Sequence, residues 1–371
     1  MKIGVPREVK DNEFRVALTP VGVNELVKRG HTVFLEAGAG VGSAISDDDY
    51  RSVGAKITSR PEDIWEAGDL ILKVKEPIAE EFGFLRRDQA LFTYLHMAAQ
   101  PKCAEALLQA GTTAIAYETV QLPNGQLPLL YPMSEVAGCL APQVAAFHLM
   151  VQHGGRGVLM GGIGGVPNAK VLVLGAGVSG SNAAGIAQGM GADVTIMDTD
   201  LDKLRAVNWR FHGSVKPLAS SDLAIQREVS QADVVVGTVL VPGARAPKLV
   251  TNDMVATMKP GSVLIDIAID QGGCFEDSRP TTHSEPTFEV HNSIFYCVGN
   301  MPGAVPCSST QALTNATLSH VLQIADHGWR EAMRNSPPLA LGLNVHDGHV
   351  YNANVAAALD REALDLEELL A

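Results

Sequence analysis

The sequence lacks any apolar run long enough to cross a membrane. No charge-free stretch of about 18 apolar residues occurs, the length that a spanning helix needs. The N-terminal segment MKIGVPREVK goes directly into a short strand and charged residues, so it contains no signal-peptide core. We therefore expect a cytoplasmic protein with no membrane partner.

Positive charge is also scarce. The 371 residues include 28 Lys and Arg against 41 Asp and Glu, a formal net charge of −13, and no basic cluster interrupts the acidic excess. Such a surface repels the phosphates of nucleic acids and anionic lipids. Nucleic acid is therefore not an expected partner.

Cysteine is present without a pattern. The residues form no C-x-x-C pair, and no histidine stands at metal-ligand spacing from any of the five: Cys103, Cys139, Cys274, Cys297 and Cys307. This spacing predicts neither a zinc site nor a disulfide framework. We interpret them as buried or incidental thiols.

What the sequence does have is a regular alternation of strand and helix signals, which is typical of parallel sheets covered by helices. One series of short apolar runs precedes residue 121 and includes KIGVP, TVFLEAG and ALFTYLH. A second series starts at VLVLG and continues through DVTIMD and SVLIDIAID. The length allows two or three domains. We expect an α/β fold with two Rossmann-like, doubly wound parallel-sheet domains.

Helical patterns flank the second series. Residues 134–152 and 308–328 predict two long helices that join the domains, and the acidic residues 360–370 predict a terminal helix. The simplest topology is discontinuous, with residues 1–130 and 305–371 in one domain and residues 131–304 in the other. The glycine-rich stretch from 154 to 165 has two interpretations, an ordered loop or a flexible hairpin.

The run VLVLGAGVSG, residues 171–180, places a glycine fingerprint between a strand and a helix. Gly175 permits a tight turn, Gly177 lets the backbone approach a pyrophosphate, and Gly180 lets the helix pack closely on the strand. The N-terminus of that helix offers free N–H groups and a positive dipole end to the phosphates. The motif predicts a dinucleotide site.

The type of dinucleotide follows from the next strand. ADVTIMD ends in Asp198, 23 positions after Gly175, where an acidic side chain reads a ribose hydroxyl. A carboxylate there repels the extra phosphate of NADP, so NAD is the expected cofactor. Residues 131–304 are then the NAD-binding Rossmann domain, and the other domain binds the substrate and carries catalysis. The alternative is a glycine-rich turn that binds no ligand.

Three cationic or titratable side chains stand near strand ends of the first domain, where open α/β sheets bind ligands. Arg15 lies in NEFRVALTP, Lys75 closes DLILKVKEP, and His96 closes ALFTYLH. Arginine and lysine can hold a small carboxylate and a carbonyl, and histidine can exchange a proton near neutral pH. The alternatives are surface ion pairs with Glu13 and Glu76, and a strand cap made by the histidine.

Asp270 holds the equivalent place in the second domain, at the end of SVLIDIAID. A carboxylate there is a candidate for orienting a polar reactant. Its alternative is a turn-forming aspartate before Gln271-Gly272-Gly273.

Segments throughout the chain resemble those of alanine dehydrogenases. They are EFRVALTP, LILKVKEP, FTYLHMAA, IAYETVQ, GGRGVLMGG, VLVPGARAPKLV, DIAIDQGGCFEDSRPTT, NMPGAVP and TQALTNATL. The similarity is collinear and fades only near the C-terminus. Motif agreement this dense is specific, unlike the glycine fingerprint alone.

The resemblance implies a reaction and roles in it. Alanine dehydrogenases reversibly convert L-alanine, NAD and water into pyruvate, ammonium and NADH. By this likeness, Arg15 and Lys75 bind the pyruvate carboxylate and carbonyl, His96 is the acid/base, and Asp270 orients or activates water and ammonia. It also implies a homo-oligomer, generally a hexamer.

The resemblance further implies a set of NAD contacts around the fingerprint. Lys203 is alternatively a solvated helix residue, and Ser220 a turn residue. The implied contacts are Ser134, Val178, Ser179, Asp198, Lys203, Ser220, Val239, Leu240, Ile267, Ala268, Ile269, Asp270, Arg279, Val298, Gly299, Asn300 and Met301.

One departure from the family concerns metal binding. Some members carry a glutamate and a histidine one helical turn apart that can hold magnesium, whereas this chain has Gln323 and His327 at the matching places. A neutral amide is a poor ligand for a hard cation, so we expect no metal.

Two other functions stay open on sequence grounds. One is the soluble NAD-binding component of a proton-translocating transhydrogenase, which shares the two-domain plan but needs membrane partners. The other is a catalytically silent NAD-binding module, which the fold alone does not exclude.

Overall fold

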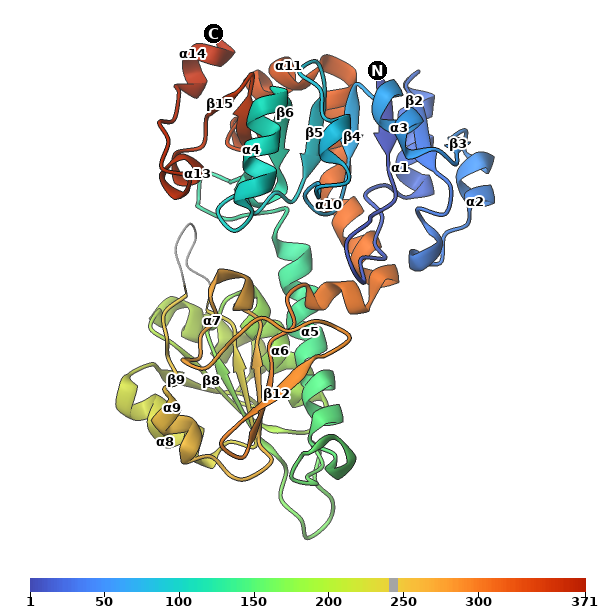
Figure 1. The fold of residues 1–371 in the computed structure, drawn as a ribbon. Coiled ribbons are helices and arrows are strands. Elements are labelled where there is room, and N and C mark those ends of the chain that lie inside the picture. The colour runs from blue at the N-terminus through green and yellow to red at the C-terminus, as the bar shows by residue number, and fades with distance from the viewer. Residues whose placement is uncertain (240–245) are drawn as a thin grey trace. The chain divides into compact units, whose positions relative to one another are not determined.

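In the computed structural model the chain forms two compact units, Met1–Met133 with Val305–Ala371 and Ser134–Ala304. The structure describes residues 1–239 and 246–371. Each unit is built around one sheet with helices on its faces (Figure 1). The predicted α/β class with two doubly wound domains is confirmed.

The first unit contains an eight-stranded sheet in the order β15-β14-β6-β5-β4-β1-β2-β3. The six strands from β6 to β3 are parallel, and β14 and β15 are antiparallel additions beyond β6. The strands are β1 (Lys2–Val5), β2 (Thr32–Glu36), β3 (Lys56–Thr58), β4 (Leu70–Leu72), β5 (Ala90–Thr93), β6 (Thr113–Ala116), β14 (Leu343–His346) and β15 (His349–Val350).

Helices of the first unit come from both ends of the chain. They are α1 (Pro20–Lys28), α2 (Asp47–Ser52), α3 (Pro61–Ala67), α4 (Pro101–Ala110), α10 (Pro306–His327), α11 (Trp329–Asn335), α12 (Pro337–Ala340), α13 (Ala353–Ala358) and α14 (Leu366–Leu370). Short 3-10 turns are η1 (Val41–Ser43), η2 (Phe82–Phe84) and η3 (Tyr117–Thr119).

The second unit contains a seven-stranded sheet in the order β12-β13-β11-β10-β7-β8-β9, in which only β12 runs antiparallel. Its strands are β7 (Lys170–Leu174), β8 (Asp193–Asp198), β9 (Lys216–Ala219), β10 (Val234–Gly237), β11 (Val263–Asp266), β12 (Thr287–Val290) and β13 (Ser293–Tyr296). Its helices are α5 (Tyr131–His148), α6 (Val178–Gly189), α7 (Leu201–Phe211), α8 (Asp222–Gln231) and α9 (Asn252–Ala256), with turns η4 (Val151–His153), η5 (Ile269–Gln271) and η6 (Met301–Ala304).

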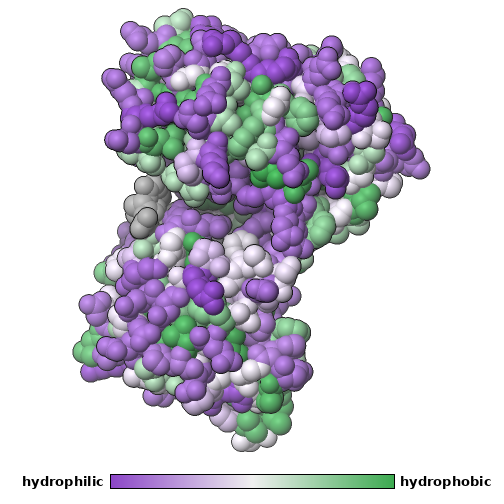
Figure 2. Space-filling model, viewed as in Figure 1, coloured by the Kyte–Doolittle hydropathy of each residue, from purple (hydrophilic) through white to green (hydrophobic). Residues whose placement is uncertain are grey.

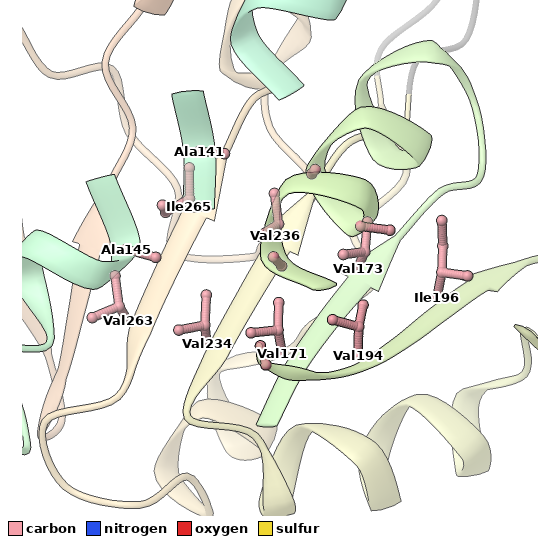
Figure 3. Close-up of a cluster of buried hydrophobic side chains, with 14 of the residues drawn as sticks. Ala141, Ala145, Val171, Val173, Val194, Ile196, Val234, Val236, Val263 and Ile265 are labelled. Carbon is pink, nitrogen blue, oxygen red and sulfur yellow. The ribbon is translucent and has the colours of Figure 1, made fainter. Parts of the chain in front are cut away.

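The second unit's core explains why its strands read as continuous apolar runs. Alternate residues of a strand point to opposite faces, and a parallel sheet is buried on both. Val171 and Val173 of β7 therefore join one cluster, whereas Leu172 and Leu174 join another. Figure 3 shows the first cluster, in which valines and isoleucines of four neighbouring strands lie on one face near the small Ala141 of α5.

The two predicted long helices are present with shifted ends. The first runs from Tyr131 to His148, and η4 follows it; the second runs from Pro306 to His327. Proline at the first helical position sets the start of α10. The longest helix of the first unit thus comes from the C-terminal part of the chain.

The expected terminal helix over 360–370 is wrong in its first half. Only Leu366–Leu370 is helical. The preceding residues follow the sheet instead, because Ala363 bridges Val350 and the Leu364 N–H donates to the Val350 carbonyl over 2.8 Å.

The glycine-rich stretch from 154 to 165 forms an ordered loop first and then enters a hairpin. Its first part is an ordered loop, in which the Gly157 N–H donates to the Leu149 carbonyl over 2.8 Å and the Arg156 N–H to the Gly261 carbonyl over 3.1 Å. Its end is a tight hairpin closed by an antiparallel bridge between Ile163 and Val166.

The molecular surface mixes hydrophilic and hydrophobic residues. On the face drawn in Figure 2, hydrophobic residues form small patches among hydrophilic ones on each unit. Among the described residues, no helix has both the length and the apolarity needed to span a membrane. All five cysteines are free thiols.

Candidate functional site

The candidate residues of the first unit lie on turns that leave the carboxyl ends of its central strands. Strand order reverses between β1 and β4, and such a switch point is where doubly wound sheets bind ligands. Glu8 follows β1, Lys73 and Lys75 follow β4, and His96 follows β5. Because these strands are parallel neighbours, their following turns meet at one edge of the sheet.

Arg15 is buried, with 2% of its surface exposed. Its Nε and one terminal nitrogen donate to both carboxylate oxygens of Glu13 over 2.7 and 2.6 Å, and the other terminal nitrogen lies 2.9 Å from the Met133 sulfur. The next residue, Val16, donates its N–H to the Thr310 hydroxyl of α10. The ion pair with Glu13 is therefore real but is not on the surface, because α10 and neighbouring turns cover it.

Lys75 is held through its backbone. The Val74 N–H donates to Glu8 over 2.6 Å, and the Lys75 N–H approaches the same carboxylate at 3.4 Å. The suggested ion pair with Glu76 is wrong, because Glu76 binds Lys10. Throughout residues 1–239 and 246–371, the Lys75 ammonium makes no ion pair.

His96 has an unusual backbone. Its φ is 46°, in the left-handed region that residues with a side chain rarely adopt. Its imidazole is stacked parallel to the Tyr94 ring, with 5.7 Å between centroids and 5° between planes. Burial, followed by the charges of Lys75, Lys10 and Arg15, lowers the pKa of His96 to about 3. The imidazole is therefore neutral at physiological pH and can accept a proton.

Glu118, on η3 just after β6, fixes the turn that carries His96. Its carboxylate accepts the N–H of His96 over 2.6 Å and the N–H of Leu95 over 3.1 and 3.2 Å. Burial raises the pKa of Glu118 to about 7, although the backbone N–H groups that it accepts act in the opposite direction.

Sequence reasoning missed Glu8, Glu118 and Tyr94. The signal that singled out Lys75 and His96, a polar residue at the end of a predicted strand, applies equally to Glu8 after KIGVP and to Glu118 in IAYETV. Tyr94 had no such signal, because an aromatic residue at a strand end is usually core.

In the second unit the fingerprint forms the expected strand–turn–helix. Gly175 has a φ of 103°, and a Cβ at Gly180 would stand only 1.8 Å from the Gly175 carbonyl oxygen. A Cβ at Gly177 would meet nothing within 4 Å. The start of α6 thus packs directly on the turn and leaves the backbone open at Gly177.

Asp198 ends β8 beside this turn. Its carboxylate accepts the Ala176 N–H over 2.7 Å and the Asp200 N–H over 2.8 Å. The Lys203 ammonium lies 3.8 Å away, and the Ser220 N–H donates to the Asp198 carbonyl. The structure therefore brings Asp198, Lys203 and Ser220 together next to the fingerprint.

Asp270 is exposed on η5, in a loop that a buried aspartate organises. Asp266, at the end of β11, accepts the N–H groups of Ala268 over 3.1 Å and Cys274 over 2.8 Å, and also binds the Ser278 hydroxyl. A Cβ at Gly299 would stand 3.0 Å from an Asp270 oxygen, so the Asp270 and Gly299 loops lie side by side. Asp266 was not predicted.

The remaining candidate NAD contacts are more scattered. Leu240 lies outside the described residues. Arg279 is exposed and its guanidinium lies 4.2 Å from the centroid of the Phe288 ring. Asn300 has a left-handed φ of 68° and its carbonyl accepts from His283. The partly exposed or buried rest are Ser134, Val178, Ser179, Val239, Ile267, Ala268, Ile269, Val298 and Met301.

Gln323 and His327 are both exposed on α10. The carboxylate nearest to them in sequence, Asp326, binds Arg29 at 2.5 Å and His31 at 2.8 Å. In the part of the chain that the structure describes, no group of three or more His, Cys, Asp or Glu side chains is placed to hold a metal ion.

Family comparisons cover nearly the whole chain. Residues 4–137 match the family described as "Alanine dehydrogenase/PNT, N-terminal domain", and residues 141–353 match "Alanine dehydrogenase/PNT, C-terminal domain". The chain is 58% identical over 371 residues to an alanine dehydrogenase of Mycolicibacterium smegmatis, with both chains covered completely. It is 59% identical over 359 residues to one of Mycobacterium tuberculosis, covering 97% of each.

The comparison with solved structures agrees with the family comparison. A structure titled L-alanine dehydrogenase superposes with a TM-score of 0.93 at 46% identity, and 100% of both chains is covered. A transhydrogenase from Sinorhizobium meliloti superposes with a TM-score of 0.80 at 26% identity, covering 95% of this chain and 99% of the other.

Proposed function

The chain belongs to the alanine dehydrogenase family, and we propose that it catalyses the reversible NAD-dependent oxidative deamination of L-alanine to pyruvate and ammonium. One water is consumed, and NADH and a proton are released. The observation that carries this proposal is the set of turns after β4 and β5, which Glu8 and Glu118 hold in place and which bring His96 within the influence of Lys75, Lys10 and Arg15.

Arg15 and Lys75 bind the substrate's polar groups in this proposal. A 2-oxo acid offers one carboxylate and one carbonyl, and a guanidinium fork and an ammonium suit them respectively. Glu13 holds the Arg15 guanidinium rigidly by two hydrogen bonds, so little side-chain freedom remains to be lost on binding. The ammonium of Lys75 forms no ion pair with a described carboxylate and is therefore the group assigned to the carbonyl.

His96 moves the proton. Oxidation at Cα turns an amine into an imine, to which water must add before ammonia leaves, and each step needs a proton acceptor or donor within reach. The neutral imidazole accepts a proton from the attacking water, and the surrounding cations make it ready to return that proton. Asp270 orients the water and the leaving ammonia.

The second unit fits NAD. When bound, this cofactor supplies the hydride acceptor. The open backbone at Gly177 suits a pyrophosphate, and the Asp198 carboxylate suits a ribose hydroxyl while repelling an added phosphate. Lys203 would lie near the adenosine ribose and Ser220 near the adenine, and Val239 with the loops from 267 to 270 and from 298 to 301 would hold the nicotinamide. We accordingly assign residues 131–304 to NAD binding.

Assembly and location follow the family. We propose a homo-oligomer, a hexamer by resemblance, that acts in the cytoplasm on small molecules. Size-exclusion chromatography with light scattering measures the number of subunits directly.

A second candidate function is the NAD-binding component of a transhydrogenase, favoured only by the structural likeness at 26% identity. Such a component passes hydride between nucleotides and needs no amino-acid site. The buried Arg15 fork and the histidine among cations favour the dehydrogenase.

The deciding experiment measures NADH formation by the purified chain with L-alanine and NAD, beside D-alanine, glycine, L-serine and NADP. We expect turnover with L-alanine and NAD. His96→Ala and Asp270→Asn should abolish turnover, and His96→Ala, which changes no proposed NAD contact, should leave NADH binding, measured by calorimetry, intact. His349→Ala, which removes an exposed histidine of β15, is the matched control and should keep wild-type rates. NAD binding without turnover in the wild type would refute the dehydrogenase.

A further inference from the structure

We propose that Glu118 is a positioning residue for the acid/base His96, holding its turn through the backbone. This inference rests on the proposed function, because it concerns how the acid/base group of that reaction is placed. Among residues 1–239 and 246–371, the Glu118 side chain makes no hydrogen bond to the imidazole of His96 or to the side chains of Arg15 and Lys75.

The hydrogen bonds that the Glu118 carboxylate accepts from other described residues come from one turn. One oxygen accepts the N–H groups of both Leu95 and His96, over 3.1 and 2.6 Å, and the second oxygen lies 3.2 Å from the Leu95 N–H. In the described residues the Glu118 carboxylate makes no ion pair. Its outward hydrogen bonds are therefore directed to the residues that carry the histidine.

The turn needs such support because its conformation is unfavourable. A left-handed backbone brings the Cβ of a histidine close to neighbouring backbone atoms, and such residues persist only where surrounding groups impose them. Two successive N–H groups that share one carboxylate oxygen hold the peptide that leads into His96, just before the left-handed residue. The 2.8 Å bond from the Ala99 N–H to the His96 carbonyl closes the other side of the turn.

The bend sets the direction of the imidazole. With this backbone the ring lies parallel to that of Tyr94, whose own hydroxyl donates to the Leu129 carbonyl over 2.6 Å. The Glu118 carboxylate therefore holds the backbone of this turn, and the Tyr94 ring is stacked with the imidazole, near Lys10, Arg15 and Lys75.

A purely structural role for Glu118 does not explain why this residue is acidic. Glu118 lies near Glu76, and burial disfavours its charge, so a carboxylate is a costly way to hold an ordinary turn. Glu8 repeats the arrangement at the Val74 and Lys75 N–H groups of the adjacent strand end. Carboxylates thus clamp the two turns that carry the candidate reacting groups of this unit.

The test separates the position of the acceptor oxygen from its charge. Glu118→Gln keeps an oxygen in place for both N–H groups but removes the charge, and we expect kcat to fall less than about tenfold. Glu118→Asp keeps the charge but withdraws the oxygen by one methylene, and we expect a fall of about 100-fold, as for a misplaced reacting group. Glu118→Ala should resemble Glu118→Asp.

Two further readouts distinguish positioning from general destabilisation. The affinity for NADH should stay within about twofold of wild type in all variants, because the cofactor contacts lie in the other unit. The acid limb of kcat/KM for L-alanine should move to higher pH in Glu118→Asp, since a displaced imidazole gains solvent and its pKa rises toward the ordinary value. Asp69→Ala is the control, as it removes an exposed carboxylate that accepts the Lys2 N–H before β4.

Specific results would overturn the proposal. They are a wild-type kcat in Glu118→Asp, or Glu118→Gln impaired more than Glu118→Asp, which would make charge the decisive property. Crystal structures of the wild type and Glu118→Asp provide a readout independent of turnover: we expect His96 to leave the left-handed region, and an unchanged turn would refute the clamp. Absence of L-alanine turnover in the wild type would instead refute the proposed function, and these structures would still decide the role of Glu118.

Discussion

Acidic side chains serve this molecule as clamps for backbone N–H groups. Glu8 and Glu118 bind the turns after β4 and β5, Asp198 binds the turn after β7, and Asp266 binds the loop after β11. Hydrogen bonds to an ionised acceptor are roughly twice as strong as neutral ones, and several on one carboxylate fix a loop without further packing. These carboxylates fix turns that directly follow the strands. Such fixed turns suit positions that must hold reacting groups.

At the fingerprint, Gly180→Ala tests how closely α6 packs on the turn before it. A Cβ there would stand 1.8 Å from the Gly175 carbonyl, so backbone must move. We expect the affinity for NADH, measured by calorimetry, to fall at least tenfold and thermal stability to drop, because the helix N-terminus withdraws from the phosphate site.

The control for this prediction is Gly189→Ala, at the other end of the same helix. A Cβ there meets nothing within 4 Å. Alanine has the higher helix propensity, so this variant should be neutral or slightly more stable, by up to about 1 kcal/mol. NADH affinity equal in both variants would show that close packing at Gly180 is unimportant.

Between elements, the first unit is joined by a buried triad of charges. The ammonium of Lys73, fully buried after β4, lies 3.1 Å from Glu8 after β1 and 2.8 Å from Glu81 before η2. Burial lowers the pKa of Lys73, but the two carboxylates more than offset it, so the net pKa is raised and the lysine stays charged. The triad ties two neighbouring strand ends to the loop that follows β4.

Lys73→Met should therefore destabilise the fold strongly. It leaves two buried carboxylates without their cation, and breaking a buried ion pair costs about 3–5 kcal/mol. Urea denaturation measures the loss, and Lys102→Met, at an exposed position of α4, should change stability by less than about 0.5 kcal/mol. Equal stability of the two variants would show that Lys73 is not needed to compensate the carboxylates.

The elements also show what sequence reasoning could and could not reach. Continuous apolar runs such as VLVLG predicted buried parallel strands, because both faces of those strands are covered. The antiparallel β14 and β15 were not predicted, since strands of four and two residues carry too little pattern to distinguish from loops. Their place depends on pairing with β6, far away in sequence.

The candidate site also contains some residues that the sequence could identify and others that it could not. Residues identified by a strand end or a glycine motif, such as His96 and Gly180, could be found by local spacing. The partners that orient them could not, because the bond from the His96 N–H to Glu118 joins residues 22 positions apart, on turns that follow different strands. The left-handed φ of His96 also could not be found from the sequence, because histidine, asparagine, aspartate and alanine residues all adopt it in this chain.

At the scale of the whole chain, the two units repeat one strand order but differ in how the chain builds them. In both, six parallel strands follow the order 3-2-1-4-5-6 of doubly wound folds. The second unit is one continuous segment with its own two cores on either side of the sheet. The first unit needs both ends of the chain, because β14 pairs with β6 and α10 supports the Arg15 loop.

This difference predicts opposite behaviour of two fragments. Residues 131–304 contain all of α5, the whole sheet of the second unit and every proposed NAD contact, so they should fold alone and bind NADH within about tenfold of the full chain, a loss below about 1.4 kcal/mol. Residues 1–133 lack β14, β15 and α10, which leaves the edge of β6 unpaired and removes Val345 and Val350 from the core cluster that they share with residues 65–116. Circular dichroism should show that they do not fold cooperatively.

Co-expression provides the converse measurement. Adding residues 305–371 to residues 1–133 restores the missing strand edge and helix, so a cooperative unfolding transition should reappear when the two pieces are produced together. Residues 1–133 folding stably alone would contradict the role given to the C-terminal segment. An unfolded 131–304 fragment, or one that does not bind NADH while the full chain does, would contradict the independence of the second unit.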